Sequence, residues 1–203
     1  LVGWVTGPDS PNDTIKRFAI TGTDLGIMWD NGDPANDQVL MAFGDTNGYC
    51  GIPPGKQWRY NTLFRSQDRS LSNTVAVPNG VVANKYSGSP VWRPGISKQI
   101  VNTIGQAPQE TGIIPTAGIA AGGKQYLNFM SIRSWDANGA WTTNYSAIAM
   151  SPDNGETWGG VYPGTIRTPG GAGNENFQMG AFLKPGARRP VRLHLRHAQR
   201  PRR

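Results

Sequence analysis

Several residue types that carry common chemistry are scarce in this 203-residue chain. Cys50 is the only cysteine, so no disulfide can form within the chain. His194 and His197 are the only histidines, and both lie near the C-terminus. The first 186 residues therefore have no Ser-His-Asp triad and no His-rich metal site, and a Cys-His nucleophile is disfavoured. No G-x-x-x-x-G-K-[ST] phosphate loop occurs either, and we predict neither a metal nor a cofactor.

Charged residues are also few, at 16% of the chain, whereas there are 27 glycines and 16 prolines. This composition argues against a helical bundle, a coiled coil or a charge-rich disordered chain, and it favours short strands joined by turns. No window shows a sustained helical period, and no apolar run approaches the length of a membrane span. We therefore predict an all-β fold with strands at residues 17–21, 26–29, 38–43, 61–64, 75–77, 113–121, 125–132, 146–150 and 178–183.

Two segments, residues 27–46 and 119–135, share one pattern of strand, Gly-containing turn and aromatic-rich strand. This rhythm is typical of a propeller blade, which buries its faces only by stacking on its neighbours. We expect about three such blades in residues 1–186, fewer than a closed ring needs. The fold prediction is therefore a truncated portion of a β-propeller.

The net charge of +7 comes from one end of the chain. Eight of the 20 basic residues lie in residues 184–203, where no acidic residue occurs, so the preceding part carries 12 basic and all 13 acidic groups. One permitted set of codons for residues 189–201, read one base later, encodes a Tyr-rich alternating strand. We therefore interpret residues 187–203 as a frameshifted or disordered tail rather than a nucleic-acid-binding segment.

The most specific short motif is an Asp-box, S-x-D-x-G-x-T-W, at residues 151–158. Asp153 can accept hydrogen bonds from the backbone of its own turn, and Trp158 can pack between strands. A catalytic role for Asp153 is the alternative. We favour the structural interpretation, because Asx side chains in turns usually bond locally.

With histidine absent from most of the chain, paired carboxylates remain as the basis for catalysis. Asp24 precedes the expected strand at 26–29, and Asp45 follows the strand at 38–43. In an antiparallel pair, the start of one strand lies near the end of its neighbour, so both carboxyls can face each other at one rim. Such a pair is typical of glycoside hydrolysis, although each aspartate could instead bond its own turn.

Other residues are candidates for substrate contact. Glu110 could be a third acid at a strand mouth, and Glu175 could be a proton donor. Aromatic side chains could stack on sugar rings, and arginines could bond hydroxyl groups or orient the acids. The aromatic candidates are Trp29, Trp58, Tyr60, Trp92, Trp135 and Trp141. The predicted substrate-binding set is Trp29, Arg65, Glu110, Thr116 and Arg133.

Six stretches of the chain, spread over residues 4–186, resemble a mycobacterial and actinobacterial family. They are TGTDLGIMWDNG, QVLMAFGDTNGYC, QWRYNTLFRSQD, GIIPTAGIAAGGKQYLNFMSIRSW, WTTNYSAIAMSPDNGETW and NFQMGAF. That family, long classed as a domain of unknown function, includes endo-D-arabinofuranases (endo-D-arabinanases). The resemblance implies a five-bladed β-propeller that hydrolyses the D-arabinan of arabinogalactan and lipoarabinomannan. It also implies export, and it assigns the paired catalytic acids to Asp24 in TDLG and Asp45 in GDT.

The resemblance ends after NFQMGAF, where family members continue with further blades and this chain turns into its Arg-rich tail. Because the chain starts at Leu1, we also expect an upstream segment that would carry any export signal. Three interpretations remain open: an endo-D-arabinofuranase, a non-catalytic carbohydrate-binding propeller, and an inactive truncated product. The expected partner is a polysaccharide, with no nucleic acid and no membrane span. We expect a secreted or cell-envelope monomer.

Overall fold

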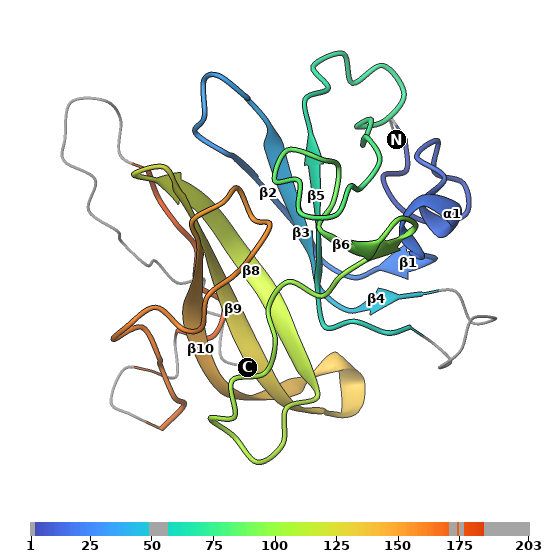
Figure 1. The fold of residues 1–203 in the computed structure, drawn as a ribbon. Helices are drawn as coiled ribbons and strands as arrows, with labels where there is room; N and C mark the ends of the chain where they lie inside the picture. The colour runs from blue at the N-terminus through green and yellow to red at the C-terminus, as the bar shows by residue number, and fades with distance from the viewer. Residues whose placement is uncertain (1–2, 49–56, 171–173, 175–176, 185–203) are drawn as a thin grey trace.

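Antiparallel strands make up most of the regular structure in the computed structural model, which describes residues 3–48, 57–170, 174 and 177–184 (Figure 1). The longest strands form one sheet in the order β10-β9-β8, with β8 at Gly112–Ala121, β9 at Lys124–Trp135 and β10 at Trp141–Ser151. A second sheet has the order β2-β3-β5, with β2 at Gly26–Asp30, β3 at Val39–Phe43 and β5 at Thr62–Ser66. The all-β prediction is confirmed.

Short elements complete the described fold. Strands β1 (Gly22–Thr23) and β4 (Thr46–Asn47) form one two-stranded ladder, and β6 (Val91–Arg93) and β7 (Ile96–Ser97) form another. Helix α1 (Thr14–Phe18) has five residues, and the 3-10 turn η1 (Ala137–Gly139) joins β9 to β10. No helix in the described ranges has the length and apolar character that crossing a membrane requires.

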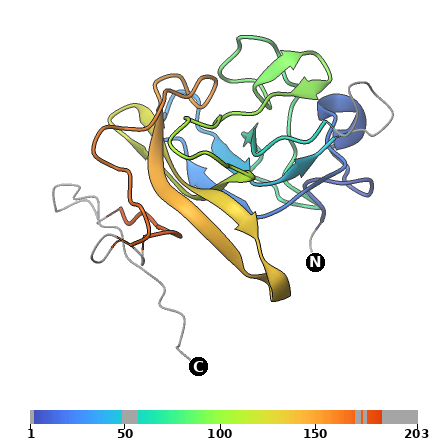
Figure 2. The same cartoon turned by 90° about the horizontal axis from the view of Figure 1, so that it is seen from below.

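The core lies where the two larger sheets pack together, with β2 lying beside β8 (Figures 1 and 2). Alternate residues of β8 and β9, among them Ile113, Leu127 and Phe129, point into this core. Trp29 of β2 fills the space beside Gly118, where an added Cβ would lie 2.1 Å from the indole. Burying these side chains is the main stabilisation that joins the two sheets.

Three predicted strands are wrong. Residues 17 and 18 end helix α1, and the chain then turns at Ala19, which has a φ of 52°. This path still buries Phe18, Ala19 and Ile20, the apolar residues of the segment. Residues 75–77 form no strand, because their backbone N–H groups bond to side chains: Ala76 to Asp68 and Val77 to Asn12, both at 2.9 Å. Residues 178–183 form no strand either.

Each of the larger sheets carries a further segment along its outer strand. Isolated bridges join Ser146 to Arg167 and Ala149 to Val161 beside β10, and the Arg65 N–H bonds to the Gly88 carbonyl at 2.8 Å beside β5. This arrangement resembles a four-stranded blade. The described residues do not form a closed ring, so the propeller and the number of its blades stay predictions.

Candidate active site

Asp24 and Asp45 lie in adjacent turns at one end of the β2-β3-β5 sheet. Gly26 at the start of β2 pairs with Phe43 at the end of β3, which places the two turns side by side. The Asp24 N–H donates to the Asp45 carbonyl at 2.9 Å, and the Gly44 N–H donates to the Asp24 carbonyl at 2.7 Å. The structure therefore brings both carboxyl groups to one rim, as antiparallel pairing predicts.

A pocket of about 310 Å³ opens beside these two aspartates, and we call it the carboxylate pocket. Its opposite wall is the end of the β9–β10 hairpin, and Met179 of the last described segment closes one side. The pocket combines three carboxyl groups with aromatic and aliphatic surface, the usual make-up of a small-molecule or saccharide site. Its lining residues are Asp24, Leu25, Asp45, Ile114, Met130, Trp135, Asp136, Gly139, Ala140, Trp141 and Met179.

Asp45 is the most perturbed acid in the carboxylate pocket. Burial raises its pKa to about 6, the negative charge of Asp24 adds to the rise, and a hydrogen bond from Trp58 opposes it. Its Oδ1 is buried and has no hydrogen-bond partner among the described residues. Asp24 is exposed, and its Oδ1 accepts the Leu25 N–H at 2.8 Å. A half-buried acid beside an exposed one suits a division into proton donor and anion.

Sequence reasoning gave no role to Asp136, the third carboxyl of the pocket. It follows Trp135 at the end of β9, a position analogous to that of Asp45 after β3. Hydrogen bonds from Thr142 and then Ser134, each at 2.8 Å, lower its pKa. Asp136 therefore remains an ionised acceptor at neutral pH. The one signal in the sequence was an aspartate directly after a tryptophan at a strand end.

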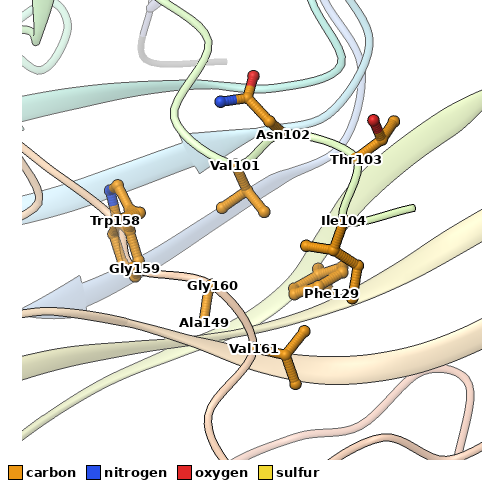
Figure 3. A pocket seen from close by; sticks show the side chains of 10 residues that line it. All are labelled: Val101, Asn102, Thr103, Ile104, Phe129, Ala149, Trp158, Gly159, Gly160 and Val161. Atoms are coloured by element: carbon orange, nitrogen blue, oxygen red, sulfur yellow. The ribbon is translucent and has the colours of Figure 1, made fainter. Parts of the chain in front are cut away.

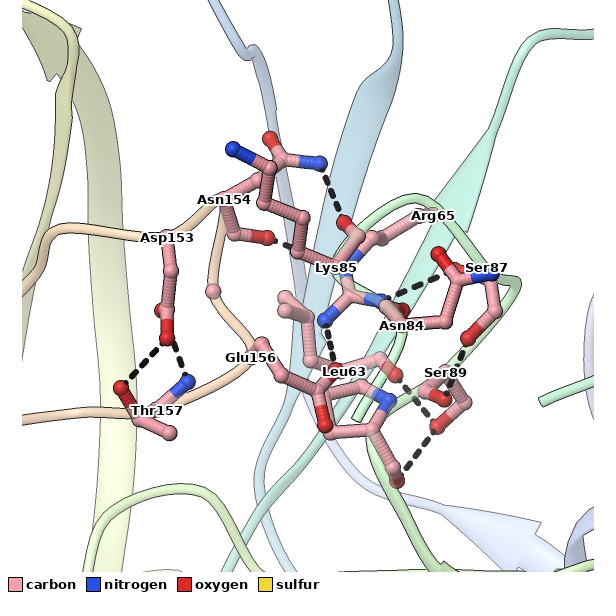
Figure 4. A network of polar contacts seen from close by, with 12 residues as sticks. Leu63, Arg65, Asn84, Lys85, Ser87, Ser89, Asp153, Asn154, Glu156 and Thr157 are labelled. Carbon is pink, nitrogen blue, oxygen red and sulfur yellow. Dashed lines mark hydrogen bonds and ion pairs between the residues drawn. The ribbon is translucent and has the colours of Figure 1, made fainter. Parts of the chain in front are cut away.

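Two of the predicted substrate-binding residues lie away from the pocket and are buried. Trp29 belongs to the core, where its Nε1 donates to Gln125 Oε1 at 2.8 Å. Arg65 is wholly buried, and its Nη2 contacts Glu156 Oε2 at 2.7 Å (Figure 4). Arg65 is wholly buried and only 8% of Trp29 is exposed, so neither side chain is open to a bound polysaccharide in this conformation.

Glu110, Thr116 and Arg133 also lie outside the carboxylate pocket. Glu110 Oε1 accepts from Tyr145 at 2.6 Å and Ser131 at 2.8 Å. Ser131 alternates with Met130, which lines the pocket, so Glu110 lies on the other face of the sheet. Thr116 donates to the Gly180 carbonyl at 3.2 Å and thereby fastens the segment that carries Met179. Arg133 is exposed, and Glu175 lies outside the described residues.

The Asp-box begins at Ser151, the last residue of β10, whereas Trp141 at the start of β10 lines the carboxylate pocket. It forms a closed turn in which Asp153 bonds to Thr157 (Figure 4). Asp153 accepts from the Thr157 N–H at 2.8 Å, the Thr157 hydroxyl at 2.6 Å and the Ser151 hydroxyl at 2.9 Å. Partial burial alone would raise the pKa of Asp153, but these bonds outweigh it and lower the pKa. Gly155, with a φ of 78°, supplies the tight turn. The structural interpretation of Asp153 accounts for every one of these contacts.

A second pocket, of about 200 Å³, lies between the 101–104 loop and the segment after the Asp-box (Figure 3). Phe129, Ala149, Trp158 and Val161 supply its apolar surface. None of its lining residues is titratable, so it offers no acid or base. Within the described ranges, no group of three or more His, Cys, Asp or Glu side chains is arranged to hold a metal ion.

The family model described as "Domain of unknown function (DUF4185)" matches residues 9–191. No curated protein matches the sequence. Among solved structures, one match is a Bacteroides ovatus protein provisionally described as a hydrolase, with 10% sequence identity and a TM-score of 0.40. The match covers 68% of this chain and 37% of the Bacteroides ovatus protein, so this chain spans little more than a third of the length of that protein.

Proposed function

The chain belongs to this family of unknown function, and we propose that it is a glycoside hydrolase with Asp24 and Asp45 as its catalytic carboxyl groups. The observation that carries the proposal is the carboxylate pocket. It sets an acid with a pKa of about 6 beside a second, exposed aspartate and two tryptophans. Two carboxyl groups that flank the scissile bond are the usual catalytic groups in glycoside hydrolysis.

The two aspartates take different roles because their surroundings differ. Asp45 stays partly protonated near neutral pH, so it serves as the general acid that protonates the leaving oxygen. Asp24 is exposed to the pocket and serves as the anion that attacks the sugar or activates water. Once Asp45 has given up its proton, the hydrogen bond from Trp58 stabilises the carboxylate left behind.

For the substrate we propose D-arabinan, cleaved at internal D-arabinofuranosyl linkages of mycobacterial arabinogalactan and lipoarabinomannan. The TDLG and GDT stretches that resemble endo-D-arabinofuranases supply two of the three carboxyls of the pocket, Asp24 and Asp45. A neutral, hydroxyl-rich polymer also suits a pocket with aromatic walls and acidic acceptors, which would repel an anionic polysaccharide. Such a substrate places the protein in the cell envelope or outside the cell.

The test is to incubate purified mycobacterial D-arabinan with the chain and to measure soluble arabino-oligosaccharides and new reducing ends. Asp24→Asn and Asp45→Asn should each lower release by about 10²- to 10⁴-fold. Asp68→Asn, at a half-buried aspartate outside the carboxylate pocket, is the matched control and should keep its activity. A form with its reading frame restored after Gly186 runs alongside, so that an effect of the tail is separated from an effect of the site.

Full activity in either pocket variant would overturn the proposal. D-arabinan binding without new reducing ends, unchanged by both substitutions, would instead support the non-catalytic carbohydrate-binding alternative. Release by the restored form alone would support the proposed chemistry and identify the present chain as an impaired version. No release and no binding by either form would contradict the substrate assignment.

A further inference from the structure

The far wall of the carboxylate pocket is the tip of the β9–β10 hairpin, residues 135–141, which we call the hairpin tip. Trp135 and Trp141 are paired across the two strands. The turn between them is closed by hydrogen bonds from the Asp136 N–H to the Ala140 carbonyl at 2.9 Å and from the Ala140 N–H to the Ala137 carbonyl at 3.3 Å. Figure 2 shows the hairpin extending from the body of the sheets, so the tip is a built feature with a defined shape.

Trp135 presents aromatic surface to the pocket. Its side chain is 49% exposed, although the residue ends a strand whose inner positions are buried. One edge of its ring lies near Gly112, where an added Cβ would be 3.4 Å from the indole Cζ2. Leaving so much indole surface in water forgoes the burial that a tryptophan usually provides, and Tyr and Trp surfaces of this kind commonly serve recognition.

Asp136 adds a fixed acceptor beside this ring. Ser134 donates to its Oδ1 and Thr142 to its Oδ2, so the carboxylate is held in one orientation. A carboxylate has about four lone-pair sites, which leaves about two for other donors. The same bonds lower its pKa, which keeps it an acceptor at neutral pH. Since Asp45 and Asp24 line the same pocket, a sugar ring on Trp135 would be part of the same chain as the one at the catalytic pair.

We propose that Trp135 and Asp136 form a sugar-binding subsite next to the catalytic carboxyls. Trp135 stacks on the face of a furanose ring of the polysaccharide, and Asp136 accepts hydrogen bonds from its hydroxyl groups. This inference rests on the proposed function, because it takes the occupant from the same pocket. The subsite holds the polymer across the reacting bond and thereby sets how many rings a substrate must have.

Binding is best measured in the Asp45→Asn background, where hydrolysis does not deplete the ligand. Isothermal titration with purified D-arabino-oligosaccharides would compare this protein with versions that also carry Trp135→Ala or Asp136→Asn. We expect the Kd to rise at least 10-fold for Trp135→Ala and several-fold for Asp136→Asn. The Kd of Trp135→Phe should lie between that of the Asp45→Asn parent and that of Trp135→Ala. Trp92→Ala is the matched control, since Trp92 is 62% exposed and does not line the pocket.

In the active protein, the same substitutions should raise KM for D-arabinan while changing kcat little, because they remove binding that is shared by ground and transition states. Thermal unfolding of each variant checks that the hairpin tip is still folded. An unchanged Kd and KM in Trp135→Ala would overturn the subsite even if D-arabinan is hydrolysed. Weaker binding in Trp135→Ala, with no hydrolysis by either the present chain or the form whose reading frame is restored, would uphold the subsite and remove the catalytic proposal.

Discussion

At one end of the two larger sheets Glu156 is buried against Arg65 at 2.7 Å and Lys98 at 3.1 Å, whereas at the other end Asp45 has an oxygen that no described group bonds. Arg65 also donates to the Asn154 carbonyl at 2.9 Å and the Ser87 carbonyl at 2.9 Å, so its donors are used within the protein (Figure 4). Both ends hold acids and both are partly buried. Glu156 and Asp45 differ in whether the described part of the protein supplies partners for both carboxyl oxygens.

This difference distinguishes acids that stabilise the fold from acids that are candidates for function. A buried charge with a full set of partners holds segments together, and its loss leaves the partner uncompensated. Asp45 is half-buried with one oxygen that has no partner among the described residues, and burial raises its pKa, a combination typical of functional sites. The predictions below test this contrast, starting with the largest expected effect.

Arg65→Met should destabilise the fold by about 3–5 kcal/mol, because it leaves Glu156 buried with one remaining cation. Urea unfolding followed by tryptophan fluorescence measures the loss. Arg69→Ala is the control: its ion pair with Asp37 at 2.5 Å is half-exposed and should be worth at most about 1 kcal/mol. Equal losses in the two variants would show that burial of the Arg65 network adds nothing.

Asp153→Ala should lower the free energy of unfolding by about 2 kcal/mol and leave D-arabinan hydrolysis intact. The pKa of Asp153 is lowered in the fold, so its contribution is present above about pH 4 and is lost as the pH falls through the lowered pKa. Stability should be measured at pH 7 and below pH 4. Loss of activity with the fold retained would restore the catalytic interpretation of the Asp-box.

Asp45→Asn should raise the free energy of unfolding at neutral pH, whereas Asp153→Ala lowers it. The pKa of Asp45 is about 6 in the fold and about 3.9 in an unfolded chain, so wild-type stability is lost as the pH rises through this window. Asparagine does not titrate, and after allowing for partial exposure the gain at pH 8 should be about 1 kcal/mol. The two melting temperatures should converge near pH 4.

Asp68→Asn should destabilise the protein at neutral pH, in contrast to Asp45→Asn. Hydrogen bonds from the Ala76 N–H and from Ser70 lower the pKa of Asp68 to about 2. That variant should melt below the wild type at pH 7. Should Asp45→Asn also melt below the wild type there, Asp45 would be a structural acid like those at the other end.

Trp58→Phe should produce the smallest change, a shift in the pH profile. The hydrogen bond from Trp58 lowers the pKa of Asp45, so its removal should raise that pKa. If Asp45 is the general acid, the alkaline decline of kcat/KM begins near pH 6 and moves to higher pH in the variant. Trp92→Phe, outside the pocket, should leave the profile in place. A shift to lower pH would exclude Asp45 as the acid.

Part of the site was predictable because it depends on local rules. The positions of Asp24 before one strand and Asp45 after the next follow from antiparallel pairing, and the Asp-box residues bond within their own turn. The contacts of Arg65 were not predictable, since its partner Glu156 lies 91 positions along the chain. Asp136 was missed because it reaches the pocket only when the β8-β9-β10 sheet packs beside the β2-β3-β5 sheet.

By itself, the sequence determined the all-β class and most strand positions, and it predicted carboxyl groups as the candidate catalytic residues because histidine is absent from residues 1–186. These follow from alternation, turn residues and the chemical inventory, all of which are local. Only the tertiary structure decided which acids are satisfied and which are exposed to a pocket. Burial and electrostatic surroundings depend on segments far apart in sequence, so the same residue type becomes a structural anchor at Glu156 and a perturbed acid at Asp45.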